Sequence, residues 1–260
     1  MTERGLWIGL EAENWTHFIN RHSFNDYEFF HQLLEQNPGA AVDIGCGTGR
    51  LLVPLLQAGF QVDGVDISPD LLEICRANLE LDGLNTRLYQ QAMQELDLPQ
   101  KYHSILVPCD AFYLIVDRSE VIEMLDRFYR HIEPGGLLTF TLPSPFDEDG
   151  PDWNNGSFAA GWHPAKPFDL PDGNQLEQVI LCEQFDRIEQ IVTGKARFRI
   201  FKAGNVVEEE IYPWHNRHYF RNEVLAMLES AGFIDIQVYG DYTPDPYSID
   251  HIQMIFVARK

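Results

Sequence analysis

The chain has 260 residues, and its 19 lysines and arginines stand against 40 aspartates and glutamates, which gives a formal charge of −21 at pH 7. This charge repels phosphate backbones and anionic membrane surfaces, so it argues against nucleic acid and lipid as partners. A hydrophobic content of 45% and an aromatic content of 12% favour a packed globule over a disordered chain.

The cysteines and the N-terminal residues indicate the compartment in which the protein is expected. Four cysteines lie far apart without metal-type spacing, so we expect reduced thiols and no metal site. The first twelve residues lack a basic start followed by an apolar core, and no apolar run approaches the roughly 20 residues of a membrane-spanning helix. We expect a cytoplasmic protein without a membrane partner, and we make no prediction of its oligomeric state.

Helix and strand patterns alternate from about residue 25 to residue 143, which predicts a parallel sheet with right-handed crossovers. Ser68 followed by Pro69 is typical of a helix start, with the serine as the cap. The expected helices are residues 24–36, 51–58, 69–82, 119–132 and 220–230. The expected strands of the sheet are a run ending at Asp43 and residues 61–65, 88–93, 104–108, 137–142, 234–239 and 252–258.

The pattern changes after residue 143. Residues 144–172 are rich in Pro, Gly, Asp and aromatic side chains, which predicts an ordered loop or lid rather than a linker. An antiparallel meander is predicted over residues 176–185, 188–201 and 206–214. We therefore divide the chain into a core with an N-terminal helical cover (1–143), a lid loop with the meander (144–218), and a C-terminal helix with closing strands of the core sheet (219–260).

A glycine-rich turn joins the first strand to the helix that follows it. Gly45, Gly47 and Gly49 come at alternate positions directly after Asp43. Such glycines allow positive φ and let a ligand lie against the backbone, where the first free N–H groups of the helix point. The carboxylate of Asp66, at the end of the second strand, can accept two hydrogen bonds from a ribose diol. Two strand ends together predict a nucleoside site.

The spacing of these glycines distinguishes between two nucleoside cofactors. The dinucleotide fingerprint G-x-G-x-x-G would place its third glycine at position 50, which is Arg50. The loop from Asp43 to Gly49, together with Asp66, instead resembles the first two motifs of class I S-adenosylmethionine-dependent methyltransferases. The resemblance extends over nearly the whole chain, with the meander inserted after the fifth strand as in several small-molecule enzymes.

The resemblance implies an α/β, Rossmann-like fold with a mostly parallel seven-stranded sheet, helices on both faces and a small antiparallel β subdomain. It implies S-adenosylmethionine as the cofactor and in-line transfer of its methyl group to a small soluble acceptor. The family usually carries an aspartate for the adenine amino group where this chain has Ala92, or Gln91 if the alignment shifts by one. The residues that the resemblance places at the cofactor are Asp43, Gly45, Cys46, Gly47, Gly49, Asp66, Ile67, Ala92, Met93, Pro108 and Cys109.

Candidate catalytic residues follow the fourth strand or lie in the region expected to cover the pocket. The resemblance places Asp110 near the methyl end, where it orients an amine, accepts a proton or merely caps a helix. His163 and His215 are each a candidate base or a hydrogen-bonded loop histidine. The N-terminal segment resembles the part of the family that folds over the cofactor, with Trp15 or Tyr27 as contacts, although a plain amphipathic helix shows the same aromatics.

Candidate substrate residues are aromatic or basic. Tyr113 adjoins the predicted methyl end, and Trp162 and Trp214 predict an aromatic wall for an organic molecule or its cation; core packing is the alternative for each. Arg197 and Arg199 share one face of a strand and predict binding of a carboxylate or phosphate, unless that face is simply solvated.

Other functions remain compatible with these motifs. A relative that transfers an aminopropyl group would use the same fold, and so would a cofactor-binding sensor or scaffold without turnover. The acceptor atom is left open among oxygen, nitrogen, carbon and sulfur.

Overall fold

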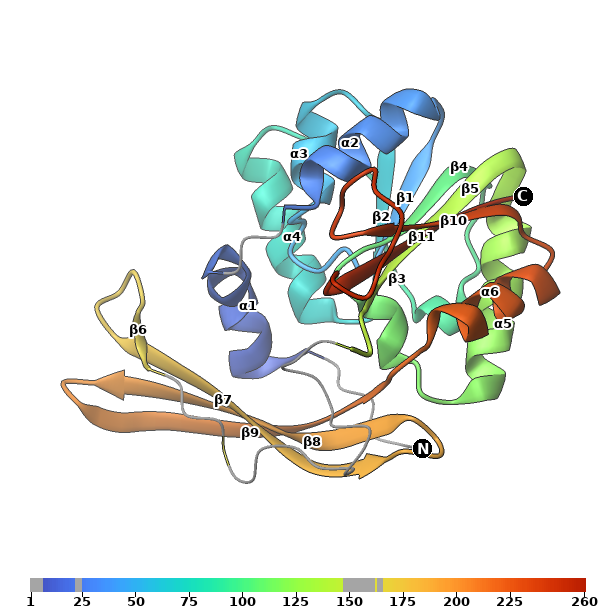
Figure 1. Ribbon diagram of the computed structural model, residues 1–260. Coiled ribbons are helices and arrows are strands. Elements are labelled where there is room, and N and C mark those ends of the chain that lie inside the picture. The colour runs from blue at the N-terminus through green and yellow to red at the C-terminus, as the bar shows by residue number, and fades with distance from the viewer. Residues whose placement is uncertain (1–6, 22–24, 147–161, 163–165) are drawn as a thin grey trace.

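The computed structural model describes residues 7–21, 25–146, 162 and 166–260 (Figure 1). The main sheet comprises β1 (Ala41–Ile44), β2 (Val62–Asp66), β3 (Leu88–Gln90), β4 (Tyr102–Val107), β5 (Ile132–Pro143), β10 (Ile234–Gly240) and β11 (Gln253–Arg259). The helices are α1 (Gly9–Arg21), α2 (Tyr27–Gln36), α3 (Leu52–Gln57), α4 (Pro69–Leu81), α5 (Arg118–His131) and α6 (Arg221–Ser230), with short 3₁₀ helices η1 (Met93–Glu95) and η2 (Ala111–Leu114).

The main sheet has the strand order β10-β11-β5-β4-β1-β2-β3. β11 pairs antiparallel with both β5 and β10, whereas the other pairings are parallel. Figure 1 shows helices on both faces of this sheet. The predicted Rossmann-like α/β fold with a mostly parallel seven-stranded sheet is therefore confirmed.

Alternation along the central strands builds two cores, one on each face of the sheet. Val42 and Ile44 of β1 pack in the cluster that includes the buried faces of α5 and α6. Ala41, from the same strand, belongs to the opposite cluster with α2, α3 and α4. Because successive side chains of a strand point to opposite faces, one short strand fixes both layers.

The start of α4 illustrates how local sequence sets an element. Ser68 accepts a hydrogen bond from Leu71 N at 3.1 Å, and Pro69 occupies the first turn. Both satisfy the requirements of a helix N-terminus, as the sequence predicts.

The third strand is shorter than predicted. β3 ends at Gln90, and the chain then turns into η1 at Met93. The side chain of Gln91 closes this turn, because it accepts a hydrogen bond from Asp97 N at 2.8 Å and donates one to Asp97 O at 3.0 Å. A polar side chain that pairs with the loop backbone competes with continuation of the strand.

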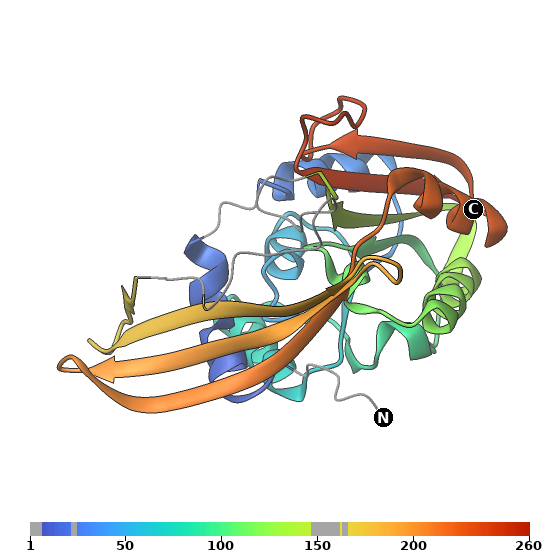
Figure 2. The ribbon, with the colours of Figure 1, turned by 60° about the horizontal axis from the view of Figure 1, so that its bottom comes forward.

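A second sheet contains the inserted residues, and its four strands lie side by side in chain order with antiparallel pairing throughout. Figures 1 and 2 show it as an extended blade beside the core, with α1 between the two. Its inner face packs Leu176, Phe198 and Ile200 against Leu10 of α1. The small antiparallel β subdomain is thus present, whereas the predicted domain boundaries stay a prediction. The four strands are β6 (Phe168–Asp169), β7 (Gln175–Asp186), β8 (Ile191–Lys202) and β9 (Asn205–Arg217).

Within the described part of the chain, no helix combines the length and the apolar character that a membrane crossing requires.

Candidate functional site

The glycine loop after β1 has the backbone that the sequence predicts. Gly45, Gly47 and Gly49 have φ of 76°, 53° and 89°, a region that residues with a Cβ rarely adopt. The loop is tied to the end of β2, since Gly47 N donates to Asp66 Oδ2 at 2.8 Å. Ser68 N donates to the other oxygen, Oδ1, also at 2.8 Å.

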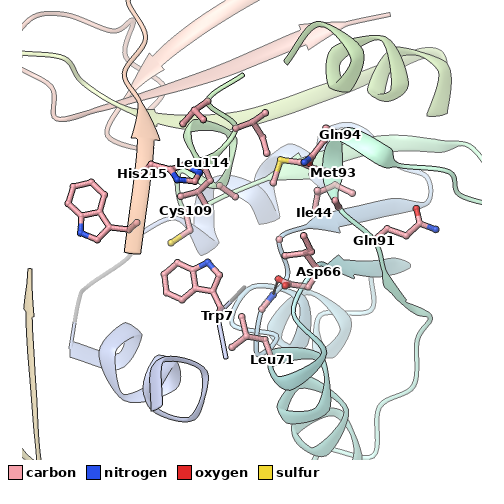
Figure 3. A pocket seen from close by; sticks show the side chains of 18 of the residues that line it. Trp7, Ile44, Asp66, Leu71, Gln91, Met93, Gln94, Cys109, Leu114 and His215 are labelled. Carbon is pink, nitrogen blue, oxygen red and sulfur yellow. Dashed lines mark hydrogen bonds between the residues drawn. The ribbon is translucent and has the colours of Figure 1, made fainter. Parts of the chain in front are cut away.

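A cavity of about 280 Å³ opens at this loop (Figure 3). It lies at the carboxyl ends of β1, β2 and β4, where the strand order reverses between β1 and β4. Open α/β sheets bind ligands at such a switch point. The predicted cofactor residues that line it are Gly45, Gly47, Asp66, Ile67, Ala92, Met93, Pro108 and Cys109.

The carboxylate of Asp66 fits a ribose diol. The residue is 7% exposed and lines the cavity. Burial raises the pKa of this carboxyl, while the hydrogen bonds from Ser68 and Gly47 lower it. Gly47 N and Ser68 N each occupy one acceptor site of a different oxygen. The backbone of Ile67 also interacts with the carboxylate, and the remaining acceptor capacity can serve a ribose hydroxyl.

The side of the cavity on which the resemblance places adenine is lined by Ile67, Ala92 and Met93. Gln91 also lines the cavity, and its side chain is hydrogen-bonded to the backbone of Asp97. Gln94, which the sequence analysis did not single out, is 4% exposed and lines the same side. Figure 3 shows Met93 and Gln94 together at one end of the cavity. The structure thus offers Gln94 as a polar group near the expected adenine.

Three of the predicted cofactor residues do not line the cavity: Asp43, Cys46 and Gly49. Asp43 is 1% exposed, and its Oδ1 has no hydrogen-bond partner among the described residues. Burial raises the pKa of Asp43 to about 7, although the positive charge of Arg50 partly lowers it. Arg50 itself pairs with Asp26 through two bonds of 2.7 and 2.6 Å.

The opposite end of the cavity is formed by Cys109 and by Trp214 and His215 of β9. Figure 3 shows His215, Cys109 and Leu114 on the same side, away from Gln94. Burial lowers the pKa of His215, so its imidazole is neutral at neutral pH and one ring nitrogen can accept a proton. Of the two predicted histidines, this one is in the cavity, and His163 lies outside the described residues.

Asp110 and Tyr113 follow Cys109 closely in the sequence, but they do not line the cavity. Asp110 has a left-handed backbone with φ of 57°, and its Oδ2 accepts from Gln253 Nε2 of β11 at 3.1 Å. Burial raises its pKa to about 6. Tyr113 packs against the core cluster, with its ring 6.4 Å from that of His218. The backbone turn directs both side chains into the protein.

Arg197 and Arg199 lie on the face of the second sheet that points away from α1. Phe198, between them, packs against α1, and strand side chains alternate. Glu177 Oε2 lies 3.5 Å from Arg197 and 3.8 Å from Arg199, and Arg199 also pairs with Glu209. Arg197 stacks over the ring of Trp162 at 4.6 Å. The structure therefore separates this predicted anion site, and Trp162 with it, from the cavity.

The sequence analysis missed residues from two segments that close the cavity. Trp7 and Glu11 line it from α1 and the residues just before it. Trp15, which the resemblance offers as a contact, lines it beside them, whereas the alternative contact Tyr27 does not. The spacing of four between Trp7, Glu11 and Trp15 would place them on one helix face, a signal that the sequence contained. The second segment runs from the end of η2 to the first turn of α5, and no motif marks it. Its lining residues are Leu114, Ile115, Val116, Asp117 and Glu120.

Comparison with known proteins agrees with this site. The family described as "Methyltransferase domain" matches residues 41–136, the stretch that contains the glycine loop and Asp66. A methyltransferase-family protein of Geobacillus sp. (strain WCH70) is 35% identical over 221 residues, which is 84% of this chain and 83% of the relative. The chain therefore belongs to the methyltransferase family.

Solved structures show the same fold. An S-adenosylmethionine-dependent methyltransferase from Clostridium acetobutylicum ATCC 824 has a TM-score of 0.74 at 17% identity, covering 95% of this chain and 98% of that one. An amino pentose methyltransferase from Micromonospora echinaspora, with S-adenosylmethionine bound, has a TM-score of 0.68 at 17% identity over 97% and 98% of the two chains. The predicted class I S-adenosylmethionine-dependent methyltransferase, an enzyme, is confirmed.

Proposed function

We propose that this enzyme transfers a methyl group from S-adenosylmethionine to a small soluble molecule. The observation that carries the proposal is one continuous cavity that joins the nucleoside-binding strand ends to a separate wall formed by Cys109, Trp214 and His215. The amino pentose methyltransferase, which has the same fold, acts on a small molecule according to its name. A cavity of this kind suits a small acceptor better than a nucleic acid, which the charge of −21 would repel.

The residues that would hold the cofactor follow from the lining. Asp66 would accept the ribose hydroxyls, and Gly45 and Gly47 would let the methionyl part lie against the backbone. Ala92 and Met93 would frame adenine with apolar contacts, and Gln94 would supply a polar one. When bound, S-adenosylmethionine supplies an electrophilic methyl group on a sulfonium.

The chain would contribute alignment and exclusion of water. Trp7 and Trp15 stand edge to face with ring centroids 4.3 Å apart, and both line the cavity. Holding nucleophile and methyl carbon in line, in a site closed to water, can supply much of the rate of such a transfer. The neutral imidazole of His215 would contact the acceptor from the wall that also contains Cys109 and Trp214.

The first test is binding and transfer with the unmodified protein. S-adenosylmethionine should raise the melting temperature, and a donor with an isotopically labelled methyl group should pass the label to a compound of a cell metabolite extract, detected by mass. Decarboxylated S-adenosylmethionine, which donates an aminopropyl group, is the control for the alternative transfer. Tighter binding of the decarboxylated form, or thermal stabilisation without label in any compound, would contradict the proposal.

A further inference from the structure

The wall of the cavity is acidic. Besides Asp66, the carboxyl groups of Glu11, Asp117 and Glu120 line it, and among the described lining residues none is lysine or arginine. The only histidine among them, His215, is kept neutral by burial. A cavity lined by one sign of charge concentrates ions of the opposite sign.

Arg217 is a basic side chain that lies behind this wall. Arg217 Nε donates to Val116 O at 2.8 Å, and the arginine is 3% exposed. It does not line the cavity, so a bound ligand would meet carboxylates and not this guanidinium. Asp117 is held in its charged form, because hydrogen bonds from Ser119 and Glu120 lower its pKa.

Glu11 is the acidic residue that lies on the acceptor side. It lies beside Tyr212 of β9, the strand that also contains Trp214 and His215. Burial raises the pKa of the Tyr212 hydroxyl, and the charge of Glu11 contributes to the same shift. The helix is fixed there, since Leu10 N donates to Glu210 Oε2 of β9 at 2.8 Å and Gly9 N donates to Asp70 Oδ2 at 3.3 Å. Glu11 therefore enters the cavity from a helix that is anchored at both the core and the second sheet.

The aromatic side chains that line the cavity also favour a cationic ligand. Trp7, Trp15 and Trp214 line the cavity together with Glu11. The face of an indole attracts a cation, most strongly where water is excluded. A carboxylate and several indoles around one space form the usual chemical environment of a bound ammonium group.

We infer that the methyl acceptor is a primary or secondary amine, which Glu11 binds as the ammonium ion and from which it removes the proton. The inference rests on the proposed function and names the substrate class of that same site. It also predicts that the reacting end of the acceptor carries no phosphate or carboxylate, because an anion there would face the carboxylate of Glu11, and no lysine or arginine is among the described lining residues.

The chemistry balances with the groups present. The ammonium N–H proton passes to the carboxylate of Glu11, which leaves a nitrogen lone pair and a neutral carboxyl. The lone pair forms the N–C bond as the S–C bond breaks, and that bond's electron pair stays on sulfur as a thioether. The product is a methylated ammonium ion. Burial raises the pKa of Glu11 to about 7, which makes it a better match for an amine than an ordinary carboxylate.

The decisive experiment blocks the amines of the substrate pool. A metabolite extract is divided, and one portion is treated with an amine-selective acetylating reagent before incubation with the labelled methyl donor. We expect label in the untreated portion and its loss after acetylation. Transfer that survives acetylation overturns the amine assignment and leaves the proposed function intact. Absence of label from both portions contradicts the proposed function itself, and the inference falls with it.

The role of Glu11 is tested with the acceptor found in that extract. Glu11→Gln should lower kcat/KM by about 100-fold or more, the usual contribution of a positioned base. Glu11→Asp should recover part of the loss, and the exposed Glu13 on the same helix provides Glu13→Gln as the matched control. Affinity for S-adenosylhomocysteine should be the same in all variants, which separates the proposed role from general damage to the cavity. A Glu11→Gln variant as active as the control overturns the assignment.

Discussion

The two ends of the cavity are built in different ways. The donor end comes from the ends of β1, β2 and β4, whose spacing is set by parallel pairing of neighbouring strands. The acceptor end comes from α1, the η2–α5 connection and β9, which lie far apart in sequence. Backbone geometry defines the first end and side chains define the second. A family can therefore keep one methyl donor while the acceptor varies with the residues of the covering segments.

The largest expected effect is at the donor end. Asp66→Ala removes the proposed ribose acceptor together with the partner of Gly47 N, so S-adenosylmethionine should bind at least about 100-fold more weakly. Isothermal titration calorimetry measures the dissociation constant, and the affinity of Asp66→Asn should lie between those of the wild type and Asp66→Ala. Glu73→Ala, at an exposed position of α4, is the control. Unchanged affinity in Asp66→Ala would remove the ribose assignment.

A change at the acceptor end should lower the rate of transfer and leave donor affinity unchanged. His215→Gln removes a neutral imidazole from the wall without touching the glycine loop, so kcat/KM should fall about tenfold or more while donor affinity stays within about twofold. Steady-state kinetics and titration with S-adenosylhomocysteine separate the two quantities. His103→Gln, at a residue outside the cavity lining, serves as the control. A loss of donor affinity equal to the loss of rate would mean that the two ends are not separate.

The buried carboxyl of Asp43 should appear as a pH dependence of stability. Burial raises the pKa of Asp43 from 3.8 to about 7. Its contribution is therefore complete below about pH 4 and is lost as the pH rises through about 7, because the folded form retains a proton that the unfolded form releases. Between about pH 5 and pH 8, the free energy of unfolding should drop less in Asp43→Asn than in the wild type. Urea unfolding without cofactor tests this, and parallel curves for the two proteins would contradict it.

The smallest expected effect on transfer is at the predicted anion site. Arg197→Ala should leave donor affinity and kcat/KM unchanged, because the guanidinium pairs with Glu177 on the face directed away from α1. Stability should fall by about 1 to 3 kcal/mol, because both side chains of the pair are largely buried and Glu177 loses a charged partner. Kinetics and thermal unfolding measure both, and a large loss of transfer would mean that the far face of the second sheet also binds the acceptor.

The donor site could be predicted from sequence because it is a local motif. Gly45 and Gly47 must adopt positive φ at a strand-to-helix turn, and Asp66 ends the next strand in the same sheet. Each of these requirements concerns only a few consecutive residues. The spacing therefore determined the fold class and the cofactor family, and the altered adenine position at Ala92 was visible as well.

The acceptor side depended on tertiary structure. Period two placed Arg197 and Arg199 on one face, but only the packing of α1 on Phe198 decided which face is inward. The left-handed turn at Asp110 directs its carboxylate to Gln253, a residue 143 positions later.

Glu11 entered the site only because α1 is held between the core and the second sheet. The sequence by itself thus determined how the chain holds its donor, since backbone conformation is a local property. Only the folded structure decided what faces the acceptor, since that depends on contacts between segments about 200 residues apart.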